Sequence, residues 1–141
     1  MRSFLVVGNQ TLDSRELEQA IAERIAAGPA TFHVVVPATP VDHGFSWDEN
    51  EARSLAEGRL ATALERLRGM GIEATGEVGH RDPVAATEDA LRGREVDGVI
   101  LSTLPPGISR WLGQDVPSRL KGAVAVPVSV VTATRESIPT T

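Results

Sequence analysis

Two histidine and aspartate pairs are the side chains best suited to metal binding or acid–base chemistry. Asp42 stands beside His43, and His80 lies two residues before Asp82. Imidazole nitrogens and carboxylate oxygens ligate metals and transfer protons near neutral pH. Both pairs fall in expected loops, where solvated histidines are common, so we expect no metal site and no catalytic residue. A hydrolase that uses Asp13 with these histidines is the weakest alternative.

Nucleophiles and nucleotide motifs are equally scarce. The serines at 14, 102 and 109 lack the G-x-S-x-G surroundings of a nucleophile elbow. The chain has no cysteine, which excludes disulfides, thiolate metal sites and thiol catalysis. It has no G-x-x-x-x-G-K-[ST] segment, and no G-x-G-x-x-G segment follows an expected strand. Any ligand must therefore be held by polar side chains at the ends of strands.

Apolar runs alternate with helical patterns five times along the chain. Asp13 and Glu16 form a capping-box spacing before the first helical pattern, Ser46 and Glu49 form one before the second, and Asp82 with Pro83 opens the third. The fourth helical pattern is expected to be broken into 108–112 and 115–120. His33 is expected in the core, and Trp111 as a core plug rather than a partner-binding anchor. The expected strands are residues 4–7, 32–36, 72–78, 96–101 and 124–131.

Length and composition favour one folded domain. With 141 residues, 41 % apolar and 23 % charged, the chain suits a single packed core. We expect one domain over 1–134 and a flexible tail over 135–141. The net charge of −5 argues against nucleic-acid binding. No apolar run approaches the roughly 20 residues of a membrane helix, so we expect no membrane contact and a cytoplasmic location. The alternation predicts an α/β fold, a three-layer doubly wound sandwich.

Three segments carry a family resemblance. They are Gly-His-Arg-Asp-Pro at 79–83, Val-Asp-Gly-Val-Ile-Leu-Ser-Thr at 96–103 and Pro-Val-x-Val-Val at 127–131. In their order and spacing the chain resembles the universal stress protein family from residue 4 to about 131. The resemblance implies a five-stranded, mostly parallel sheet of order 3-2-1-4-5. A doubly wound sheet binds ligands where its strand order reverses, here between the first and fourth strands.

The resemblance also implies where a ligand would bind. ATP-binding members carry a Gly-x2-Gly-x9-Gly-Ser/Thr signature after the fourth strand. This chain departs from it, because Pro105 and Pro106 lack amide donors and Gln114-Asp115 replaces Gly-Ser. ATP and AMP are the cofactor candidates, and the sequence leaves the ligand open. The candidate binding residues are Gly8, Asn9, Gln10, Thr11, Val36, Pro37, Ser102, Thr103, Gly107, Gly113 and Gln114.

Two functions remain open from the sequence. The first is a non-catalytic, stress-protein-like module that binds a small ligand, such as an adenine nucleotide, in the crevice between the first and fourth strands. It would act as a homodimer in stress response or regulation, paired through the edge strand from Val124 to Val131. The alternative is a ligand-free structural or interaction module of the same fold, with the crevice filled by the Pro105-Pro106 loop.

Overall fold

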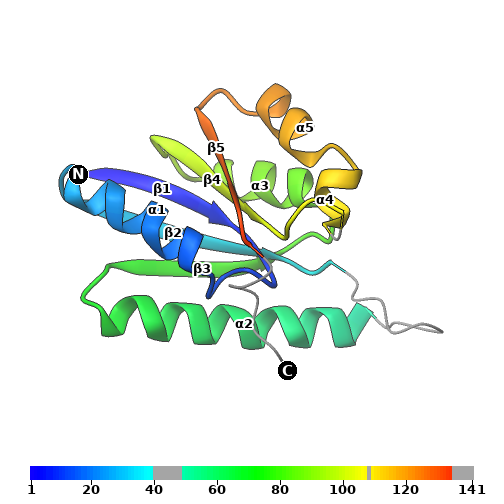
Figure 1. Ribbon diagram of the computed structural model, residues 1–141, viewed down its shortest axis with the longest axis horizontal. Helices are drawn as coiled ribbons and strands as arrows, with labels where there is room; N and C mark the ends of the chain where they lie inside the picture. Colours follow the sequence, from blue (N-terminus) through cyan, green and yellow to red (C-terminus); the bar gives the residue numbers. More distant parts are fainter. Residues whose placement is uncertain (40–48, 108, 135–141) are drawn as a thin grey trace.

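A single parallel sheet positions every candidate residue. The computed structural model describes residues 1–39, 49–107 and 109–134. Within them, all strand pairings are parallel and the five strands follow the order β3-β2-β1-β4-β5 (Figure 1). This confirms the predicted fold and strand order. The elements are β1 (Arg2–Val7), α1 (Arg15–Ala26), β2 (Ala30–Pro37), α2 (Glu49–Gly69), β3 (Ala74–Gly79), α3 (Pro83–Leu91), β4 (Gly98–Thr103), α4 (Arg110–Gly113), α5 (Val116–Ala123) and β5 (Val128–Thr132).

Helices cover both faces of the sheet. Helices α1 and α2 lie on one face, and α3, α4 and α5 lie on the other (Figure 1). Successive strand residues point to opposite faces. In β4, Ile100 therefore packs in the core beneath α1 and α2, while Leu101 packs in the core beneath α3 to α5. The continuous apolar runs of β1, β2 and β4 follow from this burial on both faces.

The fourth helical segment is broken, as the sequence predicts. Helix α4 ends at Gly113, and α5 begins at Val116 after Asp115, whose φ is +56°. An L-residue in this left-handed region interrupts an α-helix. Trp111 is buried with Leu120 in the core beneath α3 to α5, which confirms the expected core plug.

The strand boundaries differ from the sequence prediction by a few residues, because β1 begins at Arg2, β2 spans Ala30–Pro37 and β3 spans Ala74–Gly79, and the fourth and fifth strands differ most. The fifth strand was expected from residue 124 but starts at Val128, because residues 124–127 form the turn that follows α5. The fourth strand was expected over 96–101 but spans Gly98–Thr103. The Asp97 side chain accepts a hydrogen bond from the Ser3 amide at 2.8 Å just before the ladder begins. The shift places Ser102 and Thr103 inside the strand.

Helix α1 also begins one residue later than the capping box suggests. Ser14, not Asp13, is its N-cap, and the Ser14 hydroxyl accepts a hydrogen bond from the Leu17 amide at 3.2 Å. The expected cap at Ser46, the loop residues Asp42 and His43 and the tail over 135–141 lie outside the described residues. No helix in the described part of the chain is long and apolar enough to cross a membrane.

Candidate functional site

The loop after β1 closes one side of the crevice between β1 and β4. The hydroxyl oxygens of Thr11 and Ser102 lie 2.5 Å apart in a buried hydrogen bond. Gly8 allows this close approach, because a Cβ built there would lie 3.0 Å from Leu12 Cδ2 and 3.3 Å from Ser102 Cβ. Ser102 alternates with Leu101, so this contact belongs to the face covered by α1 and α2. On that face the crevice is filled by the protein's own side chains.

Asn9 joins the ends of β1 and β2 to helix α2. Its side-chain amide nitrogen donates to the Pro37 carbonyl at 2.8 Å, and its amide oxygen accepts from Arg59 Nη1 at 2.6 Å. Burial lowers the pKa of Arg59, and the negative charge of Asp13 partly opposes this shift. Arg59 was not among the binding residues predicted from the sequence. Its i, i+4 spacing from Leu55 was the available signal that it shares a helix face with apolar residues.

Thr103, the last residue of β4, differs from its hydrogen-bonded neighbour Ser102. Its side chain is 1 % exposed, and its hydroxyl has no hydrogen-bond partner among the described residues. Because Thr103 shares the strand face of Leu101, it lies on the side covered by α3 to α5. A buried hydroxyl without a partner costs about 1–3 kcal/mol. Such a group marks a place where water or a ligand atom would be stabilising.

The loop after β4 offers few donors for phosphates. Pro105 is buried and Pro106 is exposed, and neither has an amide proton. Further along, the Ser109 amide donates to the Pro105 carbonyl at 3.0 Å. The amides of Gly113, Gln114 and Asp115 donate to the carbonyls of Ser109, Arg110 and Leu112. These residues therefore do not fit the cradle of a triphosphate, because their donors are already used within the chain.

The other predicted binding residues lie just after β1, near the end of β2 or in the segment that follows β4. Val36 is buried in the core beneath α1 and α2, and Gln10 is exposed beside Asn9. Gly107 has a φ of +91° and is exposed, as are Gly113 and Gln114. The structure thus brings together Gly8, Thr11 and Ser102 in one contact and Asn9 with Pro37 in another. Among the described residues, no hydrogen bond joins either group to Gly107 or Gln114.

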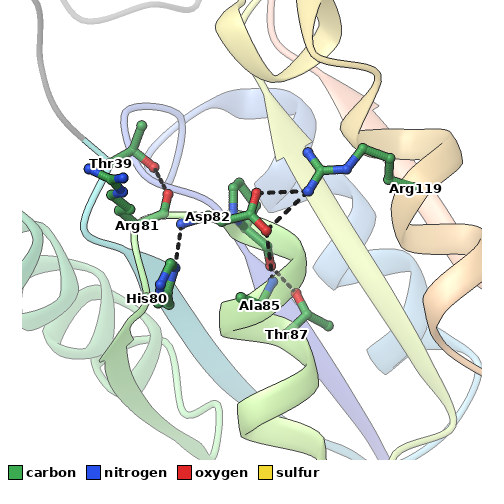
Figure 2. A network of polar contacts seen from close by, with 8 residues as sticks. Thr39, His80, Arg81, Asp82, Ala85, Thr87 and Arg119 are labelled. Atoms are coloured by element: carbon green, nitrogen blue, oxygen red, sulfur yellow. Dashed lines mark hydrogen bonds and ion pairs between the residues drawn. The ribbon is translucent and has the colours of Figure 1, made fainter.

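The turn at 79–83 uses its polar side chains to hold α3 in place. Figure 2 shows Asp82 at the start of α3, where its carboxylate accepts from the Ala85 amide at 3.2 Å and from Arg119 of α5 at 3.1 Å. His80 Nδ1 accepts from the Asp82 amide at 2.9 Å. The Asp82 carboxylate is therefore engaged in capping α3 and in joining it to α5, and His80 Nδ1 is engaged in the turn before the helix. No group of three or more potential metal ligands occurs within the described ranges.

Comparison of the sequence with protein-family models and with curated proteins finds no match. Solved structures do match. A universal stress protein family member from Burkholderia pseudomallei has a TM-score of 0.57 and 16 % identity, covering 92 % of this chain and 94 % of that one. An Arabidopsis thaliana family member with AMP bound has a TM-score of 0.67 and 9 % identity, covering 99 % and 97 %. A universal stress protein from Archaeoglobus fulgidus has a TM-score of 0.57 and 16 % identity, covering 93 % of each chain.

These likenesses extend over nearly the whole chain and concern the backbone arrangement. The class defined by the sheet order and its helices is an α/β module with parallel strands. More particularly, the protein has the fold of the universal stress proteins, which confirms the resemblance seen in the sequence at the level of fold.

Proposed function

We propose that the protein is a non-catalytic, stress-protein-like module that binds a small ligand at the carboxyl ends of β1 and β4. The observation that carries this proposal is the buried Thr103 hydroxyl, which has no partner among the described residues. It lies at the point where the strand order reverses, which is where doubly wound sheets bind ligands. A ligand acceptor or donor at this hydroxyl would remove the cost of leaving it unpaired.

The ligand we propose carries few phosphates. The amides of Gly113 and Gln114 are used inside the chain, and the two prolines at 105 and 106 offer none. An adenine nucleotide is the first class to test, because the Arabidopsis neighbour holds AMP. AMP is a better candidate than ATP here, since a triphosphate needs more donors than this loop supplies.

We further propose that the module acts as a cytoplasmic homodimer in stress response or regulation. Strand β5 is at the edge of the sheet, and its Val130 side chain is 36 % exposed. An edge strand presents unpaired backbone groups that a second copy could use. The pairing segment would be Val128–Thr132, within and just beyond the segment expected from the sequence.

A second candidate, the ligand-free interaction module, is favoured by a different contact. The Thr11–Ser102 hydrogen bond fills the crevice on the face of α1 and α2, and Pro105 is buried beside the strand end. In this candidate the loops after β1 and β4 are a closed cap, and function would reside in the dimer or in a partner surface.

Native mass spectrometry with and without AMP and ATP distinguishes the two candidates. Retention of AMP by the wild type, weakened by Thr103→Val, would support the ligand-binding module. Thr103→Ser is the matched control, because it keeps the hydroxyl and removes only the methyl group. Dimers that remain ligand-free with both nucleotides and with a metabolite extract would favour the interaction module. Monomers under every condition would contradict the proposed dimer.

A further inference from the structure

A groove between α2 and the loop after β1 lies apart from the Thr103 hydroxyl on which the proposed function rests, although Asn9 and Gln10 of its lining are among the binding residues predicted from the sequence. Its volume is about 580 Å³. Leu12, Leu55 and Ala63 supply its apolar surface. Its polar lining comes from the loop and from one side of α2, and comprises Asn9, Gln10, Asp13, Ser54, Arg59, Thr62 and Arg66. A concave surface of this mixed kind suits a small amphipathic molecule.

Among the described residues, Arg59 is the arginine of this groove that has no direct ion pair with a carboxylate. A guanidinium has five N–H donors, and Asn9 accepts one of them at 2.6 Å. Across the described ranges no other hydrogen bond reaches this guanidinium. Arg66, by contrast, is paired with Glu18 at 2.5 Å. The partly buried Arg59 side chain therefore offers donors that an oxyanion could accept in pairs. The Asp13 carboxylate also lines the groove and acts on Arg59, so an anion would bind against its repulsion.

Gly58 gives this groove room beside Arg59. It lies within α2, where glycine is about 1 kcal/mol less favourable than alanine. A Cβ built at Gly58 would meet no atom within 4 Å, so no neighbour in the chain requires a glycine there. Gly58 and Arg59 both line the groove, and the missing side chain at Gly58 leaves open space there. An incoming ligand could therefore approach the helix backbone closely.

We propose that this groove is a second ligand site that binds a small organic anion. The oxyanion head, a carboxylate or a phosphate monoester, would accept hydrogen bonds from Arg59. The apolar body would lie over Gly58 against Leu12 and Leu55. The site is independent of the ligand proposed at Thr103, because Thr103 lies on the opposite face of the sheet.

Three probes with the same aromatic body separate charge from apolar contact. Benzoate and phenyl phosphate carry the two oxyanion heads, and benzyl alcohol carries none. In spectra of the ¹⁵N-labelled full chain, we expect one or both anions to shift the Gly58 and Arg59 amide signals at millimolar concentrations. The anion that binds more tightly identifies the head group. Equal shifts with benzyl alcohol, or no shifts with either anion, would overturn the proposal.

Paired variants test the two residues that define the site. Arg59→Gln should weaken anion binding about tenfold or more, because it removes a charge-assisted hydrogen bond. Arg53→Gln is its control, since Arg53 is on the same helix and outside the groove lining. Gly58→Leu should abolish binding by filling the groove, and Gly122→Leu, at an open helical glycine of α5, should not.

Thermal unfolding of each variant separates loss of binding from loss of the fold. Gly58→Leu should unfold at the wild-type temperature or higher, because leucine favours the helix. A folded Gly58→Leu or Arg59→Gln variant with wild-type anion affinity would contradict the site. Retention of AMP at Thr103 is measured separately, so failure of one proposal leaves the other standing.

Discussion

Ser102 and Thr103 are neighbours at the end of β4, yet their hydroxyl groups have opposite surroundings. Both side chains are 1 % exposed. The Ser102 hydroxyl is hydrogen-bonded to Thr11, whereas the Thr103 hydroxyl has no partner among the described residues. Their surroundings differ because successive side chains in a strand point to opposite faces of the sheet. The end of β4 is therefore closed beneath α1 and α2, and it has an unpaired hydroxyl beneath α3 to α5.

The largest change in stability should come from removing the Ser102 hydroxyl, which is hydrogen-bonded to Thr11. Ser102→Ala would leave the Thr11 hydroxyl buried without its partner, and we expect it to lower the free energy of unfolding by about 1–3 kcal/mol. Urea denaturation measures this change. Thr11→Val combined with Ser102→Ala should recover part of the loss, because neither hydroxyl is then left unpaired. Ser54→Ala, on the exposed side of α2, is the control and should change stability little. If Ser102→Ala unfolded at the same urea concentration as the wild type, the Thr11–Ser102 hydrogen bond would not stabilise the fold as proposed.

A smaller effect of opposite sign is expected at the neighbouring position. Thr103→Val replaces the unpaired hydroxyl with a methyl group of similar size. Without ligand, we expect stability to be unchanged or raised by up to about 1 kcal/mol. The same denaturation experiment measures it. A loss as large as that of Ser102→Ala would show that the Thr103 hydroxyl is satisfied within the protein, and the contrast between the two residues would then fail.

The smallest change in stability is expected at His33, whose buried Nε2 has no hydrogen-bond partner among the described residues. Its Nδ1 lies 2.7 Å from the Thr75 hydroxyl, and its Nε2 lies 3.5 Å from a Glu77 carboxylate oxygen. Burial lowers the pKa of His33 from its ordinary value of 6.5, Arg94 lowers it further, and Glu77 partly opposes both. The fold therefore favours the neutral imidazole.

The sign of the resulting pH dependence follows from linkage. Since the unfolded chain protonates at higher pH than the fold, the contribution of His33 is complete above about pH 6.5 and declines as the pH falls through that value. Denaturation of the wild type and of His33→Gln between about pH 5.5 and 7.5 measures it. We expect a shallower decline in the variant. Equal declines would show that the proton equilibrium of His33 does not differ between fold and unfolded chain.

The sequence predicted the fold well and the candidate site less well. The apolar runs and helical patterns predicted the alternating strands and helices, and the family resemblance implied the strand order. Trp111 and His33 were correctly placed in the core. The boundaries of β4 and β5 were less accurate, because apolar residues at 124 and 126 continue the pattern into a turn. Arg59 was missed, because its spacing from Leu55 places it near an apolar helix face but does not show that its guanidinium reaches Asn9 in the loop after β1.

The strands and helices could be recognised in the sequence, because burial on both faces of the sheet requires continuous apolar runs. The two prolines also predicted a poor triphosphate cradle, since proline lacks an amide proton in any fold. Which hydroxyl at the end of β4 is hydrogen-bonded depended on the tertiary structure. That outcome depends on which face the loop after β1 packs against, and a loop 91 residues away from Ser102 supplies the partner. Contacts of this separation are made by packing, and no local pattern in the chain records them.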